Sequence, residues 1–190
     1  MASIVEICNR ALQKLGAERI TSLTQDSENA RTINVCFDAV RDAELRAHPW
    51  NFAIKRVQLA ADSTAPAFTY DNAFTLPSDF LRLLPPDDDY NYNDLDWQIE
   101  GKKILTNDGA PLNVRYIYRV SDPNQYDSLF VEALACRLAV ELCEQLTQSN
   151  TKAQIVRDDY VRAIREAKRL NAFENKPAEQ QTDTWITCRL

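Results

Sequence analysis

The sequence predicts an α+β fold that is mainly helical: a four-helix bundle with an inserted small antiparallel β region and an extended C-terminal tail. Apolar residues recur at helical spacing toward both ends of the 190-residue chain. Between them, residues 54–120 hold short alternating runs separated by clusters of turn residues. The last residues lose the helical period. We therefore expect residues 1–53 and 121–173 to form a helical bundle domain, residues 54–120 the β region, and residues 174–190 the tail.

The first two helices have recognisable ends. Gly16 is placed to end the first helix in a left-handed cap, after an apolar stripe formed by Ile4, Ile7, Cys8, Ala11, Leu12 and Leu15. The second helix is expected to begin near Asp26 or Ser27, since either side chain can cap it. It must stop before Pro49, because proline disfavours helical dihedrals in the residue that precedes it.

The stretch that follows joins this helix to the β region and holds the only histidine of the chain. From Trp50 onward we expect an extended chain, with Trp50 and Phe52 alternating outwards and inwards. We interpret His48, Pro49, Trp50 and Phe52 as a packed structural corner that starts a new layer. His48 is expected to have an architectural role, because no catalytic motif accompanies it.

The β region contains one clear hairpin and one clear strand. Residues 97–100 and 103–106 flank Gly101 and predict the hairpin. In residues 112–118 apolar side chains alternate with Asn113 and Arg115, which predicts a half-buried strand.

The last two helices also have predicted starts. The third is expected from Asp122, with Pro123 at the first helical position and Gln125 placed to reach back to the cap. Its wide apolar stripe predicts the most buried helix, packed centrally. The fourth is expected from Asn150 or Thr151, whose spacing to a glutamine three residues later suits a capping box.

Charge and composition bound the function. The net charge of −6 and the isoelectric point near 4.9 argue against tight nucleic-acid binding by the whole surface, although such a protein can still let DNA slide past. No apolar run reaches membrane-spanning length, and Glu6 stands where a signal peptide would be apolar, so we expect a cytosolic protein and no membrane partner.

Metal and cofactor sites are not predicted. The five cysteines form no CxxC pair and are interpreted as buried free thiols. Residues 89–100 match a calcium-binding loop at the first, third, fifth and twelfth positions, but Asp94 stands where the loop needs glycine. An exposed acidic loop is the preferred interpretation.

Candidate catalytic residues are few. Three acids of the third helix, Glu132, Glu141 and Glu144, have many apolar neighbours, which could raise the pKa of a catalytic acid. Helix geometry puts Glu141 and Glu144 near one another, and a solvated helix face is the preferred interpretation. With three glycines in the chain and no nucleophile motif, we expect no enzyme and no cofactor.

Two segments indicate interaction instead. The fourth helix carries a set of basic residues that includes Arg157, Arg162, Arg165 and Arg169, interleaved with acids. They form either an ion-paired, solvated face or a contact with an acidic surface of a neighbouring subunit. The tail contains Thr184, Trp185, Ile186 and Arg189, which are typical of a partner anchor. A tail folded back onto its own bundle remains the alternative.

Four segments, with a fifth match at residues 185–186, resemble a known family: residues 7–16, 48–53, 76–83 and 100–106. In these segments the chain is similar to the head-to-tail connector (adaptor) proteins of tailed bacteriophages, the group that includes tail tubular protein A and the tail accessory factor of short-tailed phages. The matches are spread in order over nearly the whole chain.

The resemblance implies a non-enzymatic virion protein. Such a protein forms a ring, usually a dodecamer, at the head-tail junction, after assembly in the host cytoplasm. The ring docks under the portal protein, offers a platform to the tail nozzle or next tail component, and lets DNA pass through its centre without specific binding. Carried onto this chain, residues 184–189 would grip the portal, and residues 54–120 would face the next tail component or the neighbouring subunit.

Two alternatives stay open. Some family members have been proposed to degrade peptidoglycan or polysaccharide, so a tail-associated hydrolase is the second hypothesis, although the sequence offers no motif for it. An unrelated acidic interaction module is the third.

Overall fold

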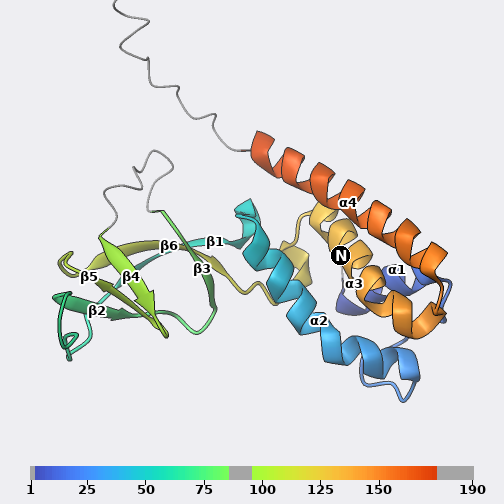
Figure 1. Cartoon of the computed structure of the whole chain (residues 1–190), viewed down its shortest axis with the longest axis horizontal. Coiled ribbons are helices and arrows are strands. Elements are labelled where there is room, and N and C mark those ends of the chain that lie inside the picture. Colours follow the sequence, from blue (N-terminus) through green and yellow to red (C-terminus); the bar gives the residue numbers. More distant parts are fainter. Residues whose placement is uncertain (1–2, 86–95, 175–190) are drawn as a thin grey trace, which may run out of the picture.

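The fold is mixed α+β and mainly helical, as the sequence predicts. The computed structural model describes residues 3–85 and 96–174. Its helices gather on one side and its strands on the other (Figure 1). The helices are α1 (Ile4–Leu15), α2 (Glu28–Ala47), α3 (Ser128–Thr147) and α4 (Asn150–Phe173), with short 3-10 turns η1 (Asn51–Ala53) and η3 (Pro123–Gln125).

The strands form two antiparallel three-stranded sheets, ordered β1-β6-β3 and β2-β5-β4. Their bounds are β1 (Ile54–Leu59), β2 (Asn72–Thr75), β3 (Phe80–Leu84), β4 (Trp97–Glu100), β5 (Lys103–Thr106) and β6 (Leu112–Tyr118). The predicted hairpin is present as β4 and β5, which pair antiparallel across a turn that holds Gly101 at φ 59°. A left-handed φ of this kind favours glycine, which has no Cβ.

The caps of α1 and α2 follow the local chemistry. Gly16 ends α1 at φ 76°, and its N–H is bonded to the carbonyl oxygens of Gln13 and Leu12, so the predicted left-handed cap is confirmed. Of the two candidate caps for α2, Ser27 is the one used, because its hydroxyl accepts the N–H of Ala30.

The start of α3 differs from the prediction, whereas α4 begins at Asn150 as predicted but with a different cap. Asp122 caps only the η3 turn, and α3 begins six residues later, where Asp127 accepts the N–H groups of Leu129 and Phe130. Ser149 caps α4 by accepting the N–H of Lys152, so the predicted capping box is wrong. In both places a competing side chain captures the free N–H groups of the helix.

The predicted 112–118 strand is present as β6, but the expectation that it is half-buried is wrong. β6 is the central strand of its sheet, between β1 and β3. Arg115 and Ile117 are both buried, although alternation places them on the face predicted to be solvated. Ile117 packs into the helical core while Tyr116 packs into the β core, so β6 is covered on both sides.

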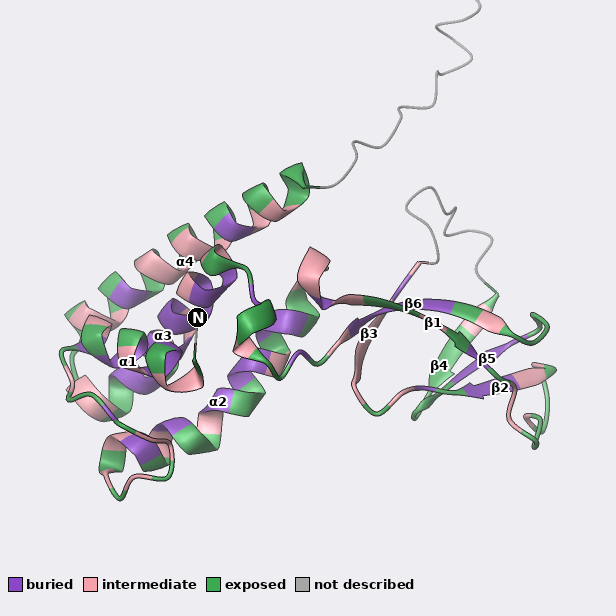
Figure 2. Cartoon of the chain, turned by 180° about the vertical axis from the view of Figure 1, so that it is seen from behind, coloured by how far each residue is buried: buried purple, intermediate pink, exposed green. Residues whose placement is uncertain are grey.

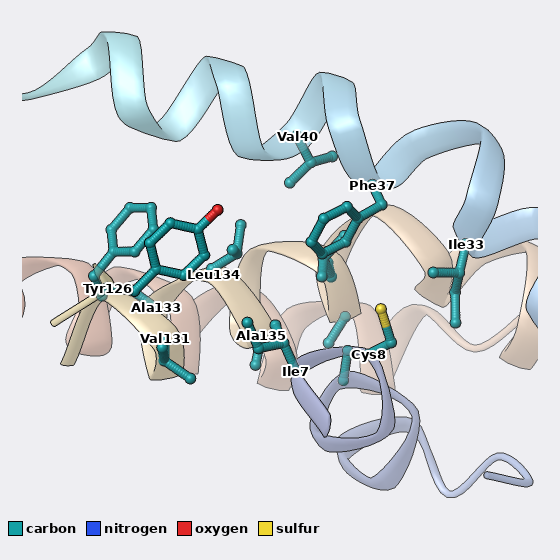
Figure 3. Packing of buried hydrophobic residues seen from close by; sticks show 14 of the residues in the cluster. Ile7, Cys8, Ile33, Phe37, Val40, Tyr126, Val131, Ala133, Leu134 and Ala135 are labelled. Carbon is teal, nitrogen blue, oxygen red and sulfur yellow. The ribbon is translucent and has the colours of Figure 1, made fainter. Parts of the chain in front are cut away.

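Two hydrophobic cores result. The larger is built around α3, which packs against α1, α2 and α4 and is central as predicted. Figure 3 shows Phe37 and Val40 of α2 and Ile7 of α1 directed toward Leu134 and its neighbours on α3. The smaller core lies in the β region and consists of Leu59, Phe74, Leu76, Ile104, Val114 and Tyr116.

The cysteines of the described residues are free. Cys8, Cys136 and Cys143 are buried and Cys36 is half-buried, in line with the interpretation as packed thiols. Cys188 and residues 89–95 of the calcium-loop match lie outside the described residues.

Candidate interaction surfaces on the fourth helix and its anchor

The corner places Trp50 at the centre of an aromatic cluster. Its side chain is 1% exposed, and its indole N–H donates to the Glu44 carbonyl oxygen at 3.0 Å. The ring lies edge-on to His48 at 4.7 Å and to Phe130 at 5.0 Å, and stacks on Phe52 at 6.1 Å between centroids. The packed corner is therefore present.

The expected extended course through the corner is wrong. Residues 51–53 form the η1 turn, closed by a bond from the N–H of Ala53 to the carbonyl oxygen of Trp50. Because the turn shortens the path, Phe52 joins Trp50 against Phe130 and does not point away from it.

The same corner holds the C-terminal end of α4. The Asn51 N–H donates to Asn171 Oδ1 at 2.9 Å, and Asn51 Nδ2 donates to the Asn171 carbonyl at 3.0 Å and to Glu174 Oε2 at 3.1 Å. Asn171 Nδ2 lies 3.3 Å from both the Pro49 carbonyl and His48 Nε2. We call these five residues the clasp. They join segments about 120 positions apart in the chain.

Within the clasp, His48 accepts a hydrogen bond. Asn171 Oδ1 already accepts from Asn51, so the Asn171 amide nitrogen faces His48 and requires an unprotonated Nε2. Burial, with Lys168 and Arg82 nearby, lowers the pKa of His48 to about 4. The ring is therefore neutral at pH 7, which suits the architectural role expected for it.

A second network ties α4 to the other helices near the middle of the bundle. The Tyr160 hydroxyl donates to Glu44 Oε1 at 2.8 Å, and Arg137 Nε lies 3.4 Å from the same oxygen. Burial and the Glu44 carboxylate raise the pKa of Tyr160 well above its usual value. Glu44 is not among the residues predicted from the sequence. Its position could have revealed it, because an acid that continues the apolar stripe of Phe37 and Val40 on α2 is expected to be buried and to need a partner.

The outward side of α4 carries three of the four predicted interface arginines on one face. At about 100° per residue, Arg162, Arg165 and Arg169 fall within about 60° of one another. All three are exposed, and Arg162 lies 3.8 Å from Asp159. Arg157 lies about 140° from Arg162 around the axis, beside α3, and does not belong to this face.

The helix also exposes apolar side chains. Ile155, Val161, Leu170 and Phe173 account for four of the seven exposed large hydrophobic residues in the part of the chain that the structure describes. Only Val156 and Ala167 of its 24 residues are fully buried. Figure 2 shows the outer edge of α4 exposed, while α3 beneath it is buried. Arginine with exposed aliphatic and aromatic groups is the composition of a protein interface.

The three candidate catalytic acids lie at exposed or partly exposed positions of α3. Glu132 forms an ion pair with Lys14 at 2.7 Å and lies 3.4 Å from Arg10. The hydrogen bond from Lys14 lowers the pKa of Glu132. A general acid needs a raised pKa. Glu141 pairs with Arg137 at 3.3 Å on the surface, and Glu144 is exposed. Burial raises the pKa of the Cys8 thiol to about 12.

Within residues 3–85 and 96–174, no group of three or more His, Cys, Asp or Glu side chains is arranged to hold a metal ion. No helix in these ranges is long and apolar enough to cross a bilayer. The predicted portal anchor, residues Thr184, Trp185, Ile186 and Arg189, lies outside the described residues. Comparison with models of protein families gives no match, and comparison with curated proteins gives none either.

Proposed function

We propose that the protein is a structural head-to-tail connector of a tailed bacteriophage, a ring subunit that docks under the portal and links it to the tail. The observation that carries the proposal is the outward face of α4, where Arg162, Arg165 and Arg169 lie among exposed apolar side chains on a helix that is packed on one side only. A ring subunit needs two different contact surfaces that repeat around the axis, and an arginine-rich helix face can form one of them.

The clasp supports the proposed role of the tail. A segment that grips the portal transmits its binding only if its base is fixed to the subunit. Glu174, the last described residue, is bonded to Asn51 of the corner, and Asn171 is held by four hydrogen bonds one turn earlier. The segment that follows is therefore attached to a fixed point of the fold.

The charge of the chain fits a DNA passage. A net charge of −6 repels the phosphate backbone, so a channel formed by such subunits would let DNA move through without specific binding. In this proposal the β region faces the next tail component, or the neighbouring subunit, and the protein is assembled in the host cytoplasm and resides at the head-tail junction.

The decisive experiment is removal of residues 176–190 followed by mixing with portal complexes. We expect the truncated protein to lose portal binding, while its circular dichroism and unfolding midpoint stay those of the full chain. A second variant keeps the full length of the chain and replaces only Trp185 and Ile186 with alanine. It should lose most of the portal binding. Undiminished portal binding by both variants would refute the anchor.

The same preparations separate the connector from the hydrolase hypothesis. The full-length protein is incubated with peptidoglycan and with capsular polysaccharide, and the release of soluble sugar is followed. We expect no turnover above a buffer blank. Clearing at enzyme-like rates would overturn the proposed connector-only function.

A further inference from the structure

A groove between α2 and α3 lies apart from the surfaces described so far. It has a volume of about 440 Å³ and an apolar floor of Val35, Cys36 and Leu142. Val35 is 85% exposed, which is unusual for a valine on a helix that contributes to the main core. Glu28 and Glu141 stand at the edge of the groove, and both are exposed.

The edge carries more carboxylate than guanidinium. Glu28 and Glu141 line the groove together with a single arginine, Arg31, which pairs on the surface with Asp26. Glu141 is held only by Arg137, at 3.3 Å on the surface, a pair that water and salt weaken and that a new cation can replace. Asp38, one turn beyond Val35 on α2, is also largely exposed.

The outward face of α4 has the complementary properties. Ile155, Arg162, Arg169 and Phe173 follow one another along one side of the helix, so apolar side chains stand at both ends of the arginines. Asp158, Asp159 and Glu166 lie on the same side, and Asp159 already faces Arg162 at 3.8 Å. Phe173 is 76% exposed. Among the described residues, neither Arg165 nor Arg169 forms an ion pair, which leaves their guanidinium groups available for a partner carboxylate.

These two surfaces belong to opposite sides of one subunit. α3 packs against both α2 and α4 and lies between them, so the groove and the arginine face of the same chain do not meet. Two different complementary surfaces that point apart are what a head-to-tail contact between identical subunits requires, and such contacts form a ring when the rotation from one subunit to the next closes.

We propose that the α2–α3 groove receives the outward face of α4 from a second copy of this chain, with apolar residues of α4 on Val35 and the arginines against Glu28 and Glu141. This inference rests on the proposed ring function and names the two surfaces that build the ring. The occupant is a second copy because this chain itself carries the basic and apolar set that matches the acidic edge and apolar floor.

A charge-exchange experiment tests the contact. Variant A carries Arg165→Glu and Arg169→Glu, and variant B carries Glu28→Arg and Glu141→Arg. In each variant the charge of one surface is reversed and the other surface is kept, so like charges meet at the contact. The association constant of each variant alone should therefore fall about tenfold or more, measured both for the free protein at high concentration and on portal complexes. Mixed in equal amounts, A and B restore both contacts as an alternating ring, and assembly should return.

Two controls keep the result interpretable. Arg19→Glu with Lys102→Glu makes the same charge change as variant A at exposed residues outside both proposed surfaces, and it should assemble like wild type. Thermal unfolding of every variant verifies that it is folded. Glu28 lies in the first turn of α2, where an arginine can weaken the helix itself. A second test therefore leaves the charge unchanged and places a photo-cross-linker, p-benzoylphenylalanine, at the exposed position of Val35.

The cross-linking readout identifies the occupant directly. Light and isotopically heavy chains are mixed and irradiated, and we expect light-heavy products between position 35 and peptides of residues 155–173. Assembly of A or B alone at the wild-type level, no recovery on mixing, or cross-links to the portal or to another segment would each overturn the proposed contact while leaving the connector function standing. A wild-type chain that neither self-associates nor binds the portal would overturn both.

Discussion

Replacing Trp50 with alanine should cost more stability than any other single truncation at the corner. The side chain is 1% exposed and contacts His48, Phe52 and Phe130 through its ring. Truncating a buried tryptophan costs about 3–5 kcal/mol. The Glu44 carbonyl also loses its donor, at about 1 kcal/mol more. We therefore expect a loss of about 4–6 kcal/mol.

The assay is urea unfolding followed by far-ultraviolet circular dichroism, with a thermal scan beside it. For a domain of this size about 2–4 °C is lost per kcal/mol, so the midpoint should fall by about 10–20 °C. Trp50→Phe keeps one aromatic ring but removes the indole N–H and part of the apolar volume, and should cost about 2–3 kcal/mol. Trp97→Ala, in the β core and only half-buried, is the control and should cost less than Trp50→Ala.

Two results would refute this reasoning. A loss below about 1.5 kcal/mol for Trp50→Ala would mean that the ring is not packed as described. Equal losses for the alanine and phenylalanine variants would mean that the hydrogen bond to Glu44, and not the packing against Phe130, dominates the contribution of this side chain.

Two further predictions concern polar groups that hold α4. The folded protein keeps the pKa of His48 near 4, against 6.5 for an ordinary histidine, so the unfolded chain binds more protons as pH falls. Stability should therefore be full above pH 6.5 and drop by on the order of 2 kcal/mol toward pH 4. His48→Gln, which keeps an acceptor for Asn171, should flatten that part of the urea-midpoint profile, and an unchanged slope would contradict the assignment. Tyr160→Phe removes the bond to buried Glu44 and should cost about 2 kcal/mol in urea unfolding. Tyr118→Phe, whose hydroxyl bond is exposed, should cost under about 0.5 kcal/mol, and equal losses for the two variants would argue against the buried network.

Features decided by local chemistry were predictable from the sequence. Gly16 and Ser27 mark helix ends because the cap needs only a few adjacent residues to form. The hairpin around Gly101 follows from its turn in the same way. The start of α3 was misplaced because two capping aspartates stand close together, and the choice between Asp122 and Asp127 depends on how the chain leaves β6. The start of α4 was predicted, but its cap was assigned to the wrong residue.

Features that depend on distant segments were not predictable. Arg115 looked solvent-facing because alternation alone cannot reveal that β6 is a central strand covered on both sides. The clasp was missed because Asn51 and Asn171 are 120 positions apart and neither carries a motif. Of the candidate site, the sequence points to the arginines of α4, and helical spacing alone separates Arg157 from the other three. Which side of α4 faces solvent depends on its packing against α3.

The clasp also determines how the fold carries mechanical load. η1 and β1 follow His48 directly, so the end of α4 is bonded to the point where the helical part of the chain passes into the β region. A force applied to the chain at Glu174 is first resisted by the hydrogen bonds of Asn51 to Asn171 and to Glu174, before it acts on the middle of α4. Tension applied at the C-terminal end thus reaches the junction between the helical bundle and the β region, where Trp50 and Phe52 pack against Phe130 of α3.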